Sequence, residues 1–86
     1  MREMVHERVS VISVFSREKG TVMPVKLRWQ AKEYRMIKLG YYHRVPNGRF
    51  VNHIFHVTDG TTDFRLRFES ETLHWILEEV TDGNAS

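Results

Sequence analysis

Two arginines, Arg65 and Arg67, lie inside a run whose apolar residues alternate, so both are expected to project from the same face of a β-strand. A guanidinium group offers permanent charge and planar donors to phosphate oxygens, and an exposed aromatic ring can stack on an unpaired base. Strand pairing is expected to bring further basic, aromatic and polar residues beside them, so we predict binding of single-stranded or structured nucleic acid. The predicted nucleic-acid or partner-binding face consists of Lys38, Tyr42, Arg44, Phe50, Asn52, Arg65, Arg67 and His74.

The same predicted face also carries apolar and acidic residues, which favour a protein partner instead. Ile54 and Ile76 are expected to lie beside Arg65, and an apolar patch of this kind is typical of an interface. Acidic residues on the face would repel a phosphate backbone. A protein-interaction adapter or a homodimer is therefore the alternative to nucleic-acid binding. The pattern is equally compatible with a face that residues 4–15 cover.

One imidazole and two carboxylates share a predicted row on adjacent strands of this face: His56, Asp63 and Glu78. Directly opposed residues of neighbouring strands have Cβ atoms about 5 Å apart, which is near the geometry of a site with histidine and carboxylate ligands. Lys38 beside His56 opposes a bound cation, and a contact between histidine and aspartate across two strands is usually structural. A metal site at these three residues is therefore the minor alternative.

Nothing in the sequence indicates catalysis or a cofactor. The glycines are spaced for turns or a tail, except Gly40, so a phosphate-binding glycine loop is absent. No serine has a base and a carboxylate placed beside it by the pattern. His53 is expected to face inward between Tyr41 and Leu66, where a hydrogen bond to the tyrosine hydroxyl would satisfy it. We therefore expect a binding module that is not an enzyme and uses no cofactor.

Three strands that would position this face are predicted between Phe50 and Leu77. Asp59-Gly60 separates the first two, and both residues tolerate positive φ, so a two-residue turn is expected there. That turn pairs Phe55 with Phe64, and the hydrophobic pattern supports the same register.

The turns on either side of these strands complete the predicted register. The turn at residues 69–72 pairs Phe68 with Leu73. The segment Val45–Arg49 reads as a three-residue hairpin loop, with proline first and glycine in a left-handed position. This loop sets Tyr42 on the outward face, beside the arginines.

Upstream, three more strands are predicted, at residues 4–15, 25–29 and 33–45. The inward parity of the third changes near Met36-Ile37, which implies a bulge or a sharp bend. Short antiparallel strands joined as a meander bury one face best in a small barrel or rolled sheet. We therefore predict an all-β fold of about six antiparallel strands, with the first strand beside the second and able to reach the last.

The chain has 86 residues, which suits a single small domain at residues 1–82, followed by a tail at residues 83–86 that is expected to fray. The absence of cysteine excludes disulfides and thiolate metal sites and fits a reducing cytoplasm. No apolar run approaches the roughly 20 residues that cross a bilayer. We therefore expect a cytoplasmic protein without a membrane partner, as a monomer or a homodimer.

Charge is distributed unevenly along the chain. Residues 1–56 contain eleven Lys/Arg and four Asp/Glu, a formal charge of +7, whereas residues 57–86 contain two and seven, a charge of -5. A basic half favours an anionic partner, although strands from both halves can alternate in one small sheet.

The segment PVKLRWQAKEYRM, with Leu27, Trp29 and Tyr34 after its proline, resembles a group of small all-β bacterial domains of unknown function. These domains carry a Pro, Leu, Trp, Tyr signature across a strand-turn-strand unit and a later tryptophan in the last strand, which Trp75 matches. Ala31 stands where such turns often have glycine. The resemblance covers about half of the chain and implies an all-β fold, and the family offers no established activity.

Overall fold

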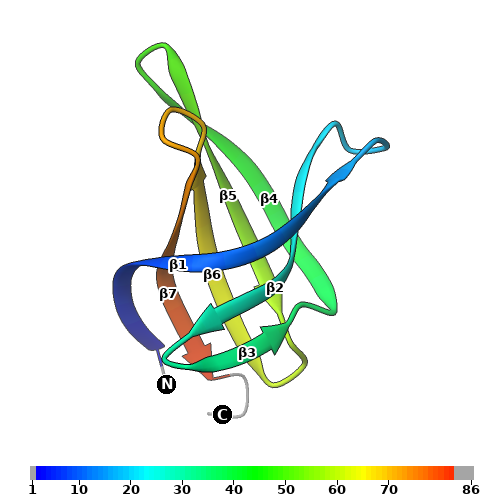
Figure 1. The fold of residues 1–86 in the computed structure, drawn as a ribbon, viewed down its shortest axis with the longest axis vertical. Coiled ribbons are helices and arrows are strands. Elements are labelled where there is room, and N and C mark those ends of the chain that lie inside the picture. The colour runs from blue at the N-terminus through cyan, green and yellow to red at the C-terminus, as the bar shows by residue number, and fades with distance from the viewer. Residues whose placement is uncertain (1, 83–86) are drawn as a thin grey trace.

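The computed structural model describes residues 2–82 and shows seven strands and no helix among them. The strands are β1 (Arg2–Ser16), β2 (Thr21–Trp29), β3 (Lys32–Arg35), β4 (Lys38–Asn47), β5 (Phe50–Thr58), β6 (Thr62–Glu69) and β7 (His74–Asp82). They form one antiparallel sheet in the order β3-β2-β1-β7-β6-β5-β4 (Figure 1). The predicted all-β class is confirmed, and the predicted tail at residues 83–86 lies outside the described residues.

The sheet has seven strands, not six, because the predicted strand over residues 33–45 is interrupted at Met36 and Ile37. The N–H of Met36 donates to the carbonyl of Val25 in β2 (3.0 Å), whereas the N–H of Ile37 donates to the carbonyl of Thr58 in β5 (2.9 Å). The chain thus crosses from edge strand β3 to edge strand β4, which confirms the predicted bend. Within residues 2–82, β3 and β4 do not pair with each other, so the sheet is rolled but not closed into a barrel.

β1 joins the two halves of the rolled sheet. Its residues Arg2–Val9 pair with β7, and its residues Ser10–Ser16 pair with β2, so the first strand lies beside both the second and the last. Figure 1 shows β1 crossing in front of the other half of the sheet, with the far ends of β1 and β2 projecting away from it. We call this hairpin, residues 10–28, the arm. Residues 4–15 therefore leave the outer face of β4–β7, the side away from the core, uncovered.

The core lies on the inner face of the roll. Phe55, Leu66 and Leu77 are fully buried and form one row across β5, β6 and β7. Leu27 and Trp29 of β2 belong to the same cluster. Complete burial of such a side chain contributes about 1.5–3 kcal/mol, so this row fixes the strands that carry the outer face.

The β5–β6 connection is wider than the predicted two-residue turn, because Thr58 pairs with Asp63 and not with Thr61. The carboxylate of Asp59 accepts a hydrogen bond from the backbone N–H of Thr62 (2.7 Å), which stabilises the wider loop. Phe55 therefore pairs with Leu66 instead of with Phe64. Because the register moves by two residues, each side chain keeps its predicted face.

The β6–β7 connection, residues 70–73, also departs from the predicted pairing. Phe68 pairs with Trp75 and not with Leu73. Leu73 has a left-handed backbone conformation (φ 61°), and its N–H donates to the carbonyl of Glu69 (2.7 Å). Leu73 therefore lies in the turn before β7 begins, where it has no partner in the β6–β7 ladder, and its side chain is exposed.

The β4–β5 connection is a two-residue turn at Gly48-Arg49, in place of the predicted three-residue loop. Gly48 has φ 64°, and a glycine with positive φ at the first turn position is typical of a type II′ turn. Pro46 stays within β4, where a proline is tolerated because β4 is an edge strand. The register differs from the predicted one by an odd number of residues, so Tyr42, and not Tyr41, lies on the inner face.

Candidate functional site

The outer face carries most of the residues that the sequence assigned to a binding surface. Asn52 pairs with Glu69, which also pairs with His74, so these three side chains form one row across β5, β6 and β7. Arg65 and Arg67 project from the centre of the same face. The predicted residues that share this face are Lys38, Phe50, Asn52, Arg65, Arg67 and His74.

Tyr42 and Arg44 do not belong to the outer face, contrary to the prediction. The ring of Tyr42 packs against that of Phe55 in the core, with the ring centroids 4.9 Å apart, and Arg44 lies opposite His53. The turn at Gly48 is the cause, because it changes the register of β4 by an odd number of residues.

Tyr41 and His43 lie on the outer face of β4, where the sequence analysis had placed Tyr42 and Arg44. Their rings stack with centroids 5.1 Å apart, and the ring of His43 lies 5.7 Å from that of His56. The pKa of His56 is lowered by burial first, and then by the charges of Arg65 and His43. Recognition of Gly48 as the first residue of a two-residue turn is the signal that would have located this cluster.

A buried carboxylate holds the two central arginines. Glu78 is only 8% exposed, and its Oε2 lies 2.5 Å from Nη1 of Arg67 and its Oε1 2.9 Å from Nε of Arg65. Nε of Arg67 also lies 3.2 Å from Oε2 of Glu69. The two Nε contacts lack hydrogen-bond alignment, so the directional bond is the one from Arg67 Nη1 to Glu78.

The position of Glu78 results from an irregularity in β7 that the sequence did not reveal. Leu66 pairs with Leu77, but Arg65 pairs with Glu79, which leaves Glu78 as an extra residue between them. Such a bulge lets two consecutive side chains reach the same face. Carboxylates therefore already neutralise Arg65 and Arg67, which reduces the positive charge available to a phosphate.

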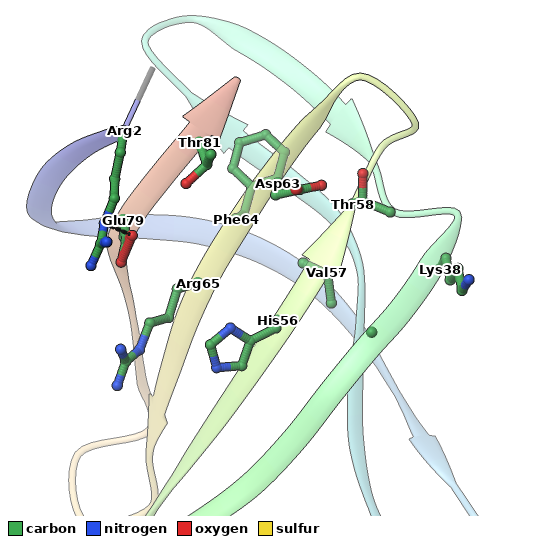
Figure 2. A pocket seen from close by; sticks show the side chains of 11 residues that line it. Arg2, Lys38, His56, Val57, Thr58, Asp63, Phe64, Arg65, Glu79 and Thr81 are labelled. Atoms are coloured by element: carbon green, nitrogen blue, oxygen red, sulfur yellow. Dashed lines mark ion pairs between the residues drawn. The ribbon is translucent and has the colours of Figure 1, made fainter. Parts of the chain in front are cut away.

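A hollow of about 560 Å³ opens on the outer face beside this cluster (Figure 2). Figure 2 shows Arg65 and His56 side by side along it, with Lys38 at the opposite rim from Arg2. Arg2 forms an ion pair with Glu79, whereas Lys38 forms none within residues 2–82. The hollow is lined by Arg2, Lys38, Gly40, His56, Val57, Thr58, Asp63, Phe64, Arg65, Glu79 and Thr81.

The predicted metal ligands His56, Asp63 and Glu78 are not assembled as a ligand set. No group of three or more His, Cys, Asp or Glu side chains that could hold a metal ion occurs within residues 2–82. The two-residue shift of register places Arg65 directly opposite His56, so a permanent cation occupies the row where a ligand was predicted. Glu78 is engaged by the arginines instead.

His53 faces inward, as predicted, and bonds to a tyrosine hydroxyl. Its Nδ1 lies 2.6 Å from the hydroxyl oxygen of Tyr42, whereas the sequence interpretation named Tyr41 as its neighbour. Burial lowers the pKa of His53, and the charge of Arg44 lowers that pKa further. A neutral imidazole in this hydrogen bond is a structural group of the core.

The arm presents the second candidate surface. Ile12, Val14 and Phe15 are 58%, 52% and 68% exposed, although all three are large apolar residues. Beside the arm, a groove of about 590 Å³ is lined by Ile12, Val25, Lys26, Arg35, Met36 and Ile37. Apolar side chains gathered on one projecting element are typical of an interaction surface.

The backbone of the arm also has a free edge. Within residues 2–82, the part of β1 from Ser10 to Ser16 pairs with β2 on one side and with no strand on the other. No residue from Val9 to Ser16 is charged. Unpaired N–H and C=O groups beside apolar side chains form a template for another strand.

The other two free edges of the sheet carry features that discourage pairing. β3 is four residues long, and three of them are Lys32, Glu33 and Arg35. β4 carries charged side chains and Pro46 and has a register irregularity beside Gly40. Charges, proline and bulges are the usual protection of an edge strand, so the arm is the unprotected edge.

Residues 2–82 contain no helix of the length and apolar character needed to span a membrane. Comparison with models of protein families, with curated proteins and with solved structures gave no match.

Proposed function

We propose that this domain is a non-catalytic protein-interaction module that adds a β-strand from its partner to the free edge of β1 in the arm. The observation that supports the proposal is the composition of this edge, which is uncharged from Val9 to Ser16 and carries three exposed apolar side chains. Protein-interaction adapters use such edges because strand addition satisfies the backbone groups of both chains.

Strand addition would supply both affinity and selectivity at the arm. Each backbone hydrogen bond formed across the edge contributes about 0.5–1.5 kcal/mol net. Alternate side chains of the added strand would meet Ile12 and Val14 on one face of the arm and Phe15 on the other. An apolar or neutral strand is therefore the partner segment that this edge accepts best.

The proposal is tested with a photo-reactive amino acid, benzoylphenylalanine, placed at Phe15 in the full chain and activated in cells that express it. We expect cross-linked products with a second polypeptide, and we expect Ile12→Lys in the same chain to reduce their yield by about tenfold, because a buried ammonium group costs at least 1.4 kcal/mol. Mass spectrometry of the products identifies the partner chain.

The matched control places the same photo-reactive group at Arg49, which is exposed in the β4–β5 turn at the end of another hairpin. Equal yields from Phe15 and Arg49, or a yield from Phe15 that Ile12→Lys leaves unchanged, would contradict binding at the arm.

Nucleic-acid binding at the outer face is the second candidate function. The observation that favours it is the hollow, whose lining includes the cationic groups of Arg2, Lys38 and Arg65. Carboxylates hold two of these, so the free charge is concentrated at Lys38. Affinity for a phosphate backbone is therefore expected to be modest and strongly dependent on salt.

Fluorescence anisotropy with a labelled single-stranded oligonucleotide tests this candidate over a range of salt concentrations. Each phosphate contact that is lost lowers the slope of log affinity against log salt by about 0.7 for a single strand. We expect Lys38→Gln to lower the slope by this amount, and Arg65→Gln with Arg67→Gln to lower affinity further. Arg49→Gln is the control for net charge, and equal behaviour of all variants would exclude this face.

A further inference from the structure

We infer that the strand added to the arm is the arm of a second copy of this chain, so that the domain forms a two-fold symmetric dimer. The inference rests on the proposed function, because it names the partner at the same edge. The observation that supports it is the sequence of the free edge, Ser10-Val-Ile-Ser-Val-Phe-Ser16. Its serines and apolar pairs are arranged symmetrically about Ser13. A two-fold axis requires a surface that is complementary to itself.

An antiparallel pair of arms centred on Ser13 matches like with like at every position. It places Ser13 opposite Ser13 of the second copy, Ile12 opposite Val14, and Val11 opposite Phe15. Ser10 and Ser16 then face each other across the pair. A slip by one or two residues in either direction would set serines opposite apolar side chains. A slip by three again matches serine with serine but pairs only about half of the segment, so the register centred on Ser13 is the one that pairs all seven residues.

Charge and shape are compatible with this pairing. No like charges face each other across the axis, because the edge has no charged residue from Val9 to Ser16. The cationic side chain of Lys26 lies on β2, so the two copies of it are separated by three strand spacings, about 14 Å, which exceeds the Debye length of about 8 Å. The antiparallel arrangement also places the two domains at opposite ends of the paired arms.

Cysteine cross-linking tests the register directly, since the chain contains no cysteine of its own. Opposed residues of an antiparallel pair have Cα atoms about 4.5–5.5 Å apart, within the range that a disulfide bridges. We expect Ser13→Cys to form a covalent dimer on mild oxidation, at a yield about tenfold above that of Ser10→Cys or Ser16→Cys alone. In those two variants the like residues are six positions apart, about 20 Å.

A mixture of the Ser10→Cys and Ser16→Cys chains provides the positive control for the same register. The two different cysteines face each other in the mixed dimer, so the mixture should cross-link although neither chain does so alone. Non-reducing electrophoresis with mass spectrometry of the linked peptides measures these yields.

Sedimentation of the unmodified chain provides a measurement that needs no cysteine. An edge of seven residues is smaller than a standard interface, so we expect a dimer with a dissociation constant on the order of micromolar. Ile12→Glu and Val14→Lys should each abolish it. A mixture of the two chains should restore a dimer, because position 12 of one copy faces position 14 of the other; circular dichroism of each variant confirms that it folds.

The outcomes separate this inference from the proposed function. A chain that stays monomeric in sedimentation up to millimolar concentration, or equal cross-linking of Ser13→Cys and Ser10→Cys, overturns self-pairing. If the photo-reactive group at Phe15 then still captures a different polypeptide in a manner that depends on Ile12, the arm remains a protein-binding edge. A monomer that also gives no such product overturns both.

Discussion

Glu78 determines what the outer face can do. Its carboxylate is buried and contacts the guanidinium groups of Arg65 and Arg67, which the sequence presented as free cations. Because both arginines are paired with this buried carboxylate, their attraction for a phosphate group is reduced. Ile54, which pairs with Arg67 on the neighbouring strand, is only 3% exposed on this face.

Replacing Glu78 with Gln should destabilise the domain by about 2 kcal/mol. The loss is below the 3–5 kcal/mol typical of a fully buried pair, because water still reaches the side chains of Arg65 (40% exposed) and Arg67 (27% exposed). Urea unfolding followed by tryptophan fluorescence measures the change. The same variant should bind an oligonucleotide more tightly than the unmodified chain, because it releases two cations.

Glu79→Gln is the control for this experiment, since the neighbouring residue holds an arginine, Arg2, that is 70% exposed. An exposed ion pair contributes about 0.2–1 kcal/mol, so this variant should lose much less stability. Equal losses for Glu78→Gln and Glu79→Gln would contradict the role assigned to the buried carboxylate.

At the scale of the strands, alternation predicted the faces of β5, β6 and β7 correctly, although both of their connecting loops differ from the predicted ones and move the register by two residues. A shift by two residues leaves every side chain on its own face, so Arg65 and Arg67 were assigned correctly. β4 was assigned wrongly from Tyr41 to Arg44, because a turn length that changes by one residue reverses the face.

The remaining features of the outer face could not be predicted from the pattern. The bulge that brings Glu78 to the outer face beside Arg65 and Arg67 depends on the ladder between two strands, and Glu78 and Glu79 are equally acidic in the sequence. The sequence likewise did not reveal that one edge of the arm is free. Residues 4–15 read as one strand, and only the observed pairing shows that its two halves have different neighbours.

Gly48→Ala should destabilise the β4–β5 hairpin by about 1–2 kcal/mol, because a side chain with φ near 64° meets the following carbonyl. Gly40→Ala is the matched control. Gly40 lies in β4 without a positive φ, and an added Cβ would lie 3.5 Å from the carbonyl oxygen of His56, an ordinary contact. Thermal unfolding of both variants tests this, and a larger loss for Gly40→Ala would contradict the assigned turn.

At the scale of the whole molecule, the charge that is unevenly distributed along the sequence is also unevenly distributed among the strands of the sheet. The basic strands β2, β3 and β4 lie towards the two ends of the strand order, and the acidic strand β7 lies at its middle. The two edge strands β3 and β4 are joined through the Met36-Ile37 corner. The outer face of β6 and β7 is the balanced part of the surface, because its arginines and carboxylates are paired.

Global stability should decrease as the pH falls below about 6.5, the pKa of an unperturbed histidine. The pKa values of His53 and His56 are lowered in the folded domain, so the unfolded chain binds protons first as the solution becomes acidic. Their contribution is fully present above that pH and is lost as the pH falls towards the lowered values. Urea midpoints at pH 7.5 and pH 5.5 measure the loss.

The double variant His53→Gln with His56→Gln should show a smaller difference between the two pH values than the unmodified chain, because it lacks both titrating groups. An unchanged difference would mean that other residues determine the pH dependence of folding.

The corner at Met36 and Ile37 holds the rolled sheet together on the side where it is not closed. One hydrogen bond ties it to β2 and the next ties it to β5, so two consecutive residues connect the strands that lie next to the two ends of the strand order. A circularly permuted chain that begins at Ile37 would keep every strand pair but lose the covalent connection between β3 and β4. The gap between β3 and β4 is therefore where the rolled sheet can open without the loss of any strand pairing.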